Sequence, residues 1–115
     1  IVKGAISNQK LKLRDDGSYD GYATHTQSCE EGEVPIYSLS KYPYNFNVLI
    51  ADCEGFLGTF YKENTELFSN LRLILFECDG VKGIVETDYG SLVNDLFKMG
   101  FKAIKGPPHI VMIKE

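Results

Sequence analysis

The sequence is poor in cysteine, and its cysteines follow none of the spacings that mark a metal cluster or a disulfide framework. Cys29, Cys53 and Cys78 are an odd number and include no CxxC pair. Structural zinc sites use such pairs, and small secreted domains use even sets of cysteines, so the sequence favours neither class. We therefore expect a protein of a reducing compartment, namely the cytoplasm.

Long hydrophobic runs and basic charge are also scarce. The apolar runs 48–51 and 73–76 are far shorter than the roughly 18 residues that span a bilayer, and no signal-peptide pattern precedes them. Lys and Arg number 12 against 16 Asp and Glu, which gives a net charge of −4. An acidic surface disfavours nucleic acid and anionic membranes as partners, because phosphate binding needs positive charge. We expect a soluble domain with neither partner.

Nucleotide and protease motifs are missing as well. The sequence has no GxGxxG, no GKS or GKT and no HExxH, so dinucleotide, nucleoside-triphosphate and zinc-protease functions have no motif to support them. What is present is a chain of 115 residues with 43% hydrophobic side chains, which suits one globular domain over residues 1–115. Because Ile1 already lies in the apolar pattern IVKGAI, we expect more sequence upstream.

The first part of the chain predicts little regular structure. Short strand-like runs at 1–6 and 10–14, joined by SNQ, predict a β-hairpin. The segment 15–45 is a predicted long loop region, polar and glycine-rich up to residue 33, with a short extended piece at 34–39. This loop region holds five tyrosines, which suits either a binding loop or partly buried anchors.

The middle of the chain predicts a strand, a helix and a second strand. Residues 46–51 and 72–78 are apolar on both faces, as buried central strands of a parallel sheet are. Between them, residues 56–71 have helical spacing with a polar break at 63–65. Together these segments make a βαβ unit with two parallel strands.

The end of the chain predicts one more helix and a hairpin. The helix begins after Asp88 as N-cap and stops at Gly100, with an apolar stripe made of Leu92, Val93, Leu96 and Phe97. Strands at 101–104 and 109–113 flank KGPP, which turns the chain, so we expect an antiparallel pair. The predicted class is therefore α/β.

The two buried strands end in almost the same residues. IADCEG closes the first and LFECDG the second, so each strand is followed by acid-Cys-acid-Gly. The carboxyl ends of adjacent parallel strands coincide, and ligands of open α/β sheets bind there, which makes this edge the candidate site. Four carboxylates are expected to line it: Asp52, Glu54, Glu77 and Asp79. They could hold Mg²⁺, or they could simply cap helices and face solvent.

Other residues add to this candidate site. Gly55 permits a positive φ and a close backbone approach to a ligand. Cys53 and Cys78 are expected to pack as small apolar residues, because no basic group nearby in the sequence would activate a thiolate. The candidate substrate contacts are Tyr22, His25, Glu77 and Asp79.

One stretch of the sequence resembles a known family. The run FNVLIADCEGFLGTFYKENTELFSNLRLILFECDG at 46–80 resembles the second half of the FkbM-type methyltransferases. In that family a buried strand ending in D-x-E-G, here residues 52–55, is followed by a helix, a strand ending in an acidic pair, another helix and a closing hairpin. Residues 1–7 look like the family's third-strand segment, and 88–104 like its late helix and sixth strand.

The resemblance implies both a fold and a reaction. The fold is a Rossmann-like, class I methyltransferase-like sheet, mostly parallel with a C-terminal antiparallel hairpin and incomplete at its N-terminus. The reaction is methyl transfer from S-adenosylmethionine, commonly to a hydroxyl oxygen of a small molecule or sugar. The resemblance places Ala5, Ile6 and Ser7 near the adenine, and Asp52, Glu54 and Gly55 near the methionine end and the acceptor. Asp52 or Glu54 would take the acceptor proton, and no metal is required.

The chain also departs from the family. It lacks the glycine-rich loop after the first strand and the acidic residue after the second, which grip the cofactor, so the activity of this chain stays open. A homodimer in which two copies complete each other's sheet edges is one way to restore the fold. The alternative functions are a Mg²⁺-dependent hydrolase or phosphotransferase built on the acidic edge, and a non-catalytic module that binds a partner through the tyrosine-rich loop.

Overall fold

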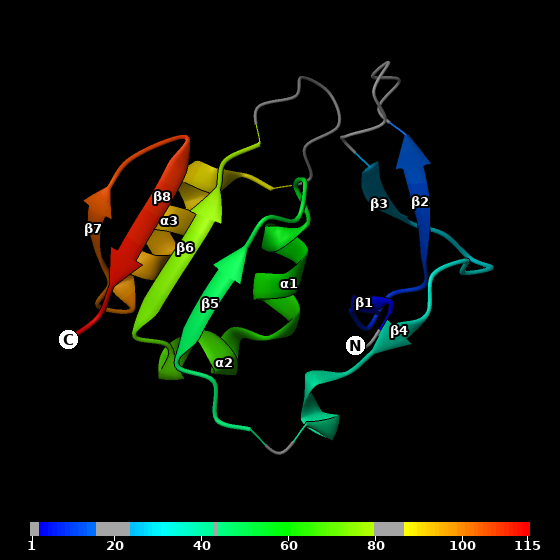
Figure 1. The fold of residues 1–115 in the computed structure, drawn as a ribbon, viewed down its shortest axis with the longest axis horizontal. Coiled ribbons are helices and arrows are strands. Elements are labelled where there is room, and N and C mark those ends of the chain that lie inside the picture. Colours follow the sequence, from blue (N-terminus) through cyan, green and yellow to red (C-terminus); the bar gives the residue numbers. More distant parts are fainter. Residues whose placement is uncertain (1–2, 16–23, 43, 80–86) are drawn as a thin grey trace. The chain divides into compact units, whose positions relative to one another are not determined.

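The computed structural model describes residues 3–15, 24–42, 44–79 and 87–115. The chain divides into two compact units, Ile1–Tyr44 and Asn45–Glu115, and each is described by itself (Figure 1). None of the helices in the described ranges is both long and apolar enough to cross a membrane. The assignment of one domain to residues 1–115 stays a prediction.

The N-terminal unit holds two small sheets and a short 3-10 helix. Strand β1 (Ala5–Ile6) pairs in parallel with β4 (Ile36–Tyr37), and β2 (Leu11–Asp15) pairs antiparallel with β3 (Thr24–Ser28). The 3-10 helix η1 (Leu39–Lys41) follows β4. The extended piece expected at 34–39 is thus confirmed in part, as the parallel partner of β1.

The hairpin expected between residues 1–6 and 10–14 is wrong. Both strands find their partners in the segment 15–45, which the sequence predicted to be a loop. The reason lies in β3, whose sequence THTQS is polar throughout and carries no hydrophobic alternation. Backbone hydrogen bonds to β2 hold such a strand in place. These bonds cannot be predicted from the spacing of apolar residues.

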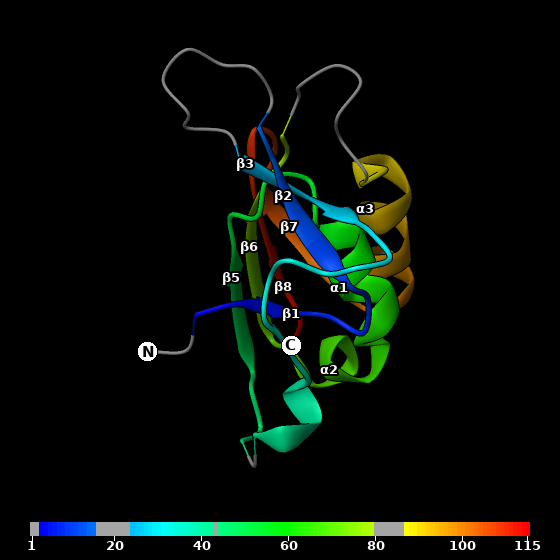
Figure 2. The ribbon, with the colours of Figure 1, turned by 90° about the vertical axis from the view of Figure 1, so that its right-hand side faces the viewer.

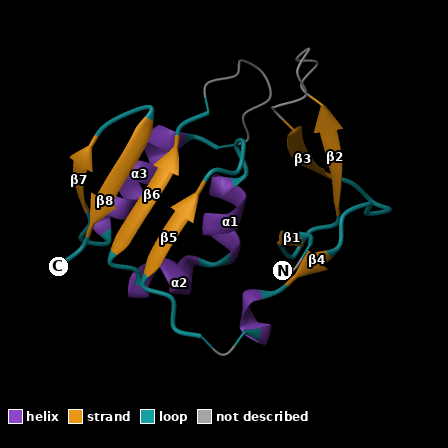
Figure 3. Ribbon diagram, in the orientation of Figure 1, coloured by secondary structure: helices purple, strands orange, loops and turns teal. Residues whose placement is uncertain are grey.

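The C-terminal unit is built on one mixed sheet of four strands in the order β5-β6-β8-β7 (Figure 3). Strand β5 (Val48–Ala51) runs parallel to β6 (Leu73–Glu77), β8 (His109–Ile113) runs antiparallel to β6, and β7 (Lys102–Lys105) runs antiparallel to β8. The βαβ unit and the closing hairpin are confirmed, and the described sheet is mixed rather than mostly parallel.

The α-helices in the described part of this unit all lie on one face of the sheet (Figure 2). Helices α1 (Leu57–Glu63) and α2 (Thr65–Asn70) connect β5 to β6, and the predicted break falls at Asn64 between them. Helix α3 (Tyr89–Lys98) connects β6 to β7. Helices α1 and α2 thus cover the predicted helical segment 56–71 except for its ends and Asn64, and α3 lies within the predicted segment between Asp88 and Gly100.

The ends of α3 are those that the sequence predicts. The Asp88 carboxylate accepts the backbone N–H of Ser91 at 3.0 Å, and Gly100 leaves the helix with a φ of +94°. Of the predicted apolar stripe, Leu92 and Leu96 are buried, whereas Phe97 is 49% exposed. The buried face of α3 is therefore narrower than the stripe suggested.

The core lies between the helices and the sheet. Its fully buried side chains come from every layer: Leu57, Phe68, Leu71, Ile74, Phe76, Leu96 and Met112. Phe68 is fully buried in it and meets Tyr61 edge-to-face, with ring centroids 5.0 Å apart. Residues of the helices thus form one buried cluster with the inward-facing residues of β6 and β8.

Strand β5 is not the central strand that the sequence predicted. Within the described residues it pairs with β6 only, so it is an edge of its sheet. Val48 and Ile50, which alternate away from the helices, are 46% and 72% exposed. The run of apolar residues led to the wrong expectation, because apolarity on both faces does not by itself require burial on both.

Candidate functional site

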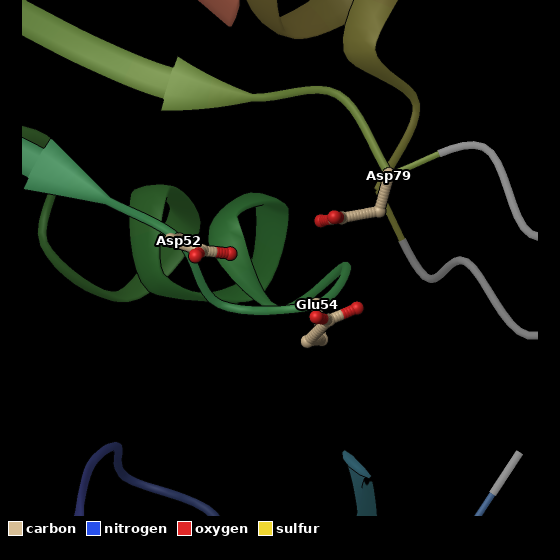
Figure 4. Close-up of side chains that lie close together, drawn as sticks. All are labelled: Asp52, Glu54 and Asp79. Atoms are coloured by element: carbon tan, nitrogen blue, oxygen red, sulfur yellow. The ribbon is translucent and has the colours of Figure 1, made fainter. Parts of the chain in front are cut away.

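Three carboxylates meet where the parallel strands β5 and β6 end. Asp52 and Glu54 follow β5, and Asp79 follows β6 (Figure 4). One carboxylate oxygen of each lies within 4.8 Å of the other two. Asp52 is exposed, whereas Glu54 and Asp79 are half-buried. We call these three residues the carboxylate cluster.

A tight turn between β5 and α1 places Glu54. Glu54 and Gly55 have successive positive φ angles, 47° and 86°, which reverse the chain at the end of the strand. Glycine adopts this conformation freely, but glutamate does so rarely. The turn thereby brings the carboxylate of Glu54 back over the edge of the sheet, beside that of Asp52.

Asp79 is fixed by hydrogen bonds from two other elements. Its Oδ2 accepts the backbone N–H of Gly55 at 2.8 Å and the hydroxyl of Tyr89 at 2.9 Å. The Tyr89 ring stacks on Phe76, with centroids 6.1 Å apart. Burial and the hydrogen bond to Asp79 raise the pKa of Tyr89, so the hydroxyl stays protonated and donates a hydrogen bond to the carboxylate.

Thr87 holds the same turn from the other side. Its buried hydroxyl donates to the Gly55 carbonyl at 2.5 Å and accepts the N–H of Gly58 at 2.7 Å. A Cβ on Gly58 would come within 2.9 Å of the Thr87 Oγ1, so this approach requires glycine. Neither Thr87 nor Tyr89 stood out in the sequence, since the partners of Thr87 lie 32 and 29 positions away and that of Tyr89 lies 10 positions away.

The two cysteines near the edge are not activated. Burial, together with the negative charges of Asp79, Asp52 and Glu54, raises the pKa of Cys53 to about 11. Burial and neighbouring carboxylates also raise the pKa of Cys78. Both side chains pack against the hydrophobic core, which confirms the prediction that they act as small apolar residues.

The fourth predicted carboxylate does not join the cluster. Glu77 is the last residue of β6 and stands opposite His109 of β8 in the ladder. Its Oε1 lies 3.7 Å from the His109 Nε2. It therefore faces the β8 side of the sheet, while Asp79, two residues further on, turns toward β5.

The remaining predicted site residues belong to the N-terminal unit. Ala5 and Ile6 form β1, and Ser7 is buried, with its hydroxyl accepting the N–H of Gln9 at 3.0 Å. His25 lies on β3 opposite Arg14 in the ladder, and Tyr22 lies outside the described residues. The roles of these five residues toward an adenine or a substrate stay predictions.

The site thus consists of the carboxylate cluster, the turn that carries Glu54 and Gly55, and the two hydroxyl residues that hold it. It presents negative charge at the carboxyl edge of a parallel strand pair, where a cationic ligand or a hard metal ion is the chemical complement. Comparison of the chain with protein families, with curated proteins and with solved structures finds no match.

Proposed function

We propose that this chain is an S-adenosylmethionine-dependent methyltransferase-like domain, with transfer to a hydroxyl oxygen of a small molecule or sugar as its reaction. The observation that carries the proposal is the carboxylate cluster, two of whose members belong to the D-x-E-G element. This element directly follows β5, and Asp79 lies two residues beyond the end of the adjacent parallel strand β6. Open α/β sheets bind ligands at this edge.

The strand order is a second line of support. The resemblance to FkbM-type methyltransferases implies a Rossmann-like sheet closed by an antiparallel hairpin. In the C-terminal unit β8 inserts antiparallel between β6 and β7, which is such a closure. The order β5-β6-β8-β7 is therefore compatible with the C-terminal half of a class I methyltransferase-like fold.

The charge of the cluster suits the cofactor. S-adenosylmethionine carries a sulfonium and an ammonium group beside a single carboxylate, which leaves a net positive charge, and its sulfonium methyl is the group that is transferred. Three carboxylates within 4.8 Å of one another repel each other, and a cation between them relieves that repulsion. The residues present thus fit the methionine end of the cofactor, while the adenine end is assigned only to Ala5, Ile6 and Ser7 of the N-terminal unit.

The three carboxylates have different roles in this proposal. Asp79 already accepts two hydrogen bonds, so it positions the turn and the ligand. Asp52 is exposed, so an acceptor hydroxyl can reach its carboxylate, which makes it the candidate base. Glu54 is held over the edge by the turn and would orient the cationic ligand.

A calorimetric titration tests this function. The chain is titrated with S-adenosylmethionine and with S-adenosylhomocysteine, and gel filtration of the same sample reports its assembly. We expect micromolar binding that weakens about tenfold, or about 1.4 kcal/mol, in the double variant D52N/E54Q. D95N, on the surface of α3, is the matched control and should bind like the wild type. A folded chain that binds neither compound contradicts the proposal.

The same cluster favours one second candidate, a Mg²⁺-dependent hydrolase or phosphotransferase. Mg²⁺ commonly uses one or two carboxylates and keeps several waters, and three carboxylate oxygens within 4.8 Å provide such ligands. This function predicts a rise in melting temperature with Mg²⁺ that disappears in D52N. If neither Mg²⁺ nor the adenosyl ligands change the melting temperature, the non-catalytic interaction module gains support.

A further inference from the structure

An apolar pocket lies in the C-terminal unit, between α3 and the β7–β8 hairpin. Its volume is about 290 Å³ and its walls are almost wholly apolar. The residues that line it come from the segment after β6, from α3 and from the hairpin, and include Cys78, Tyr89, Val93, Ala103, Pro107 and Ile110. The described residues that line it include none of the carboxylate cluster, and the proposed function gives the pocket no role.

Two walls of the pocket are held in place by other contacts. The ring of Tyr89 stacks on Phe76, with centroids 6.1 Å apart, and its hydroxyl donates to Asp79. The backbone N–H of Cys78 donates to the carbonyl of Pro108 at 2.8 Å, which ties the segment after β6 to the turn of the hairpin. A ligand that enters preformed walls loses less free energy to ordering the protein.

The volume of the pocket sets the size of the apolar part of a ligand. An apolar cavity of about 150 Å³ holds one benzene molecule. A volume of about 290 Å³ therefore takes a phenyl ring with a short chain, or an alkyl chain of similar bulk. Binding of such a body is favourable, because it removes apolar surface of both ligand and pocket from water.

The charge beside the pocket is positive. Lys105 of β7 is the one charged residue among the described residues that line the pocket, and it is exposed, which places it at the mouth. Residues 101–114, which include both strands of the hairpin, carry Lys102, Lys105 and Lys114 and no Asp or Glu. The hairpin wall is thus a basic part of an acidic chain, and it favours an anionic group on the ligand.

We propose that this pocket binds a small carboxylic acid, with the apolar body of the ligand between α3 and the hairpin and its carboxylate at Lys105. Lysine suits this role, because its flexible four-carbon stem lets the ammonium group follow a carboxylate at the mouth. A cationic ligand would meet Lys105 as a like charge, and a neutral ligand would gain no ion pair from it. This inference does not rest on the proposed function, since the pocket and the carboxylate cluster share no residue.

A titration of the isotope-labelled full chain with 3-phenylpropionate, followed by amide NMR, tests this proposal. Two compounds with the same ring and chain serve as comparisons, the neutral 3-phenylpropanol and the cationic 3-phenylpropylamine. We expect 3-phenylpropionate to bind with a dissociation constant of about 1 mM or lower, and at least about fivefold more tightly than either comparison. The amides that shift should be those of the walls, including Val93, Ala103 and Ile110. Octanoate, titrated in parallel, identifies the body: tighter binding of octanoate assigns an alkyl chain, and tighter binding of 3-phenylpropionate assigns a ring.

Matched variants locate the carboxylate and the body of the ligand. K105E and K102E change the net charge equally, but of the two lysines only Lys105 lines the pocket. We expect K105E to weaken 3-phenylpropionate at least about fivefold and K102E to weaken it less than about twofold. A103L narrows the pocket and should abolish binding, whereas I104F enlarges the next side chain of β7, which is not a wall, and should not. Both positions are exposed, so both variants should fold, and V93F replaces A103L if its NMR spectrum is that of an unfolded chain.

The outcomes decide the inference in both directions. Weaker binding in K105E and lost binding in the folded A103L variant, with K102E and I104F unchanged, support it. It is overturned if the folded chain binds neither acid, or if the amine or the alcohol binds as tightly as 3-phenylpropionate. Equal effects of K105E and K102E, or full binding by the filled variant, overturn it as well.

Discussion

Gly55 and Asp79 are joined by a hydrogen bond of 2.8 Å from the backbone N–H of the first to a carboxylate oxygen of the second. The bond connects the turn after β5 to the segment after β6, 24 positions further along the chain. It therefore fixes the spacing of the two strand ends on which the carboxylate cluster stands. The same oxygen also accepts the Tyr89 hydroxyl, so one side chain ties three segments together.

Removing the Asp79 carboxylate should destabilise the protein. In D79A the Gly55 N–H and the Tyr89 hydroxyl lose their acceptor, and an unsatisfied half-buried donor costs about 1–3 kcal/mol. Urea denaturation measures this as a fall in the free energy of unfolding. D95A removes an exposed carboxylate from α3 and should change it by less than about 0.5 kcal/mol. Equal effects of the two variants would mean that Asp79 is not structural.

The hydroxyl of Thr87 should matter more than its methyl group. T87V keeps the shape but leaves the Gly55 carbonyl and the Gly58 N–H without their partner, at a cost of about 1–3 kcal/mol. T87S keeps the hydroxyl and should cost less. Thermal unfolding of the two variants side by side gives the comparison, and a more stable T87V would contradict the bridging role.

The core under α3 should be sensitive to truncation. Leu96 is fully buried, so L96A should lower the free energy of unfolding by about 2–5 kcal/mol. Phe97 is the next residue on the same helix and is half exposed, so F97A is the matched control and should have a much smaller effect. Urea denaturation measures the free energy of unfolding of both variants. A similar loss in L96A and F97A would contradict the assignment of Leu96, and not Phe97, to the buried face of α3.

Cys53 should make the protein less stable in alkali. Its pKa is raised from 9.0 to about 11 in the folded chain, so the folded state prefers the protonated thiol. The contribution of this thiol to the free energy of unfolding is fully present below pH 9 and is lost as the pH rises toward 11. In C53A and C53S the free energy of unfolding should fall less steeply over this range than in the wild type. Parallel curves for all three proteins would show that Cys53 does not titrate there.

The elements that the sequence predicts well are those encoded by local signals. Helix α3 has a capping aspartate at Asp88 and a glycine stop at Gly100, and the break at Asn64 follows from a polar interruption of an apolar pattern. Strand β3 was missed because its polar residues carry no periodic signal. Strand β5 was predicted to be a central strand but lies at the edge of its described sheet, since an apolar run does not show whether a second neighbouring strand is present.

The candidate site follows the same division. Asp52, Glu54 and Asp79 were predicted from their position after two parallel strands, and the structure brings them together. Glu77 was predicted to join them, but it is still part of β6 and faces His109. The hydroxyl of Thr87 reaches the turn through tertiary packing, and no spacing in the sequence encodes such a contact.

The place of β8 in the sheet has a consequence for how the unit is made. β8 follows every other strand of this sheet in the chain, yet it lies between β6 and β7. During synthesis the ribosome releases β6 and β7 before the strand that joins them. Until Ile113 has emerged, the two strands have no partner between them, and Met112 cannot enter the core. The β5–β6 pair needs no later strand, whereas β7 can join the sheet only once β8 is present.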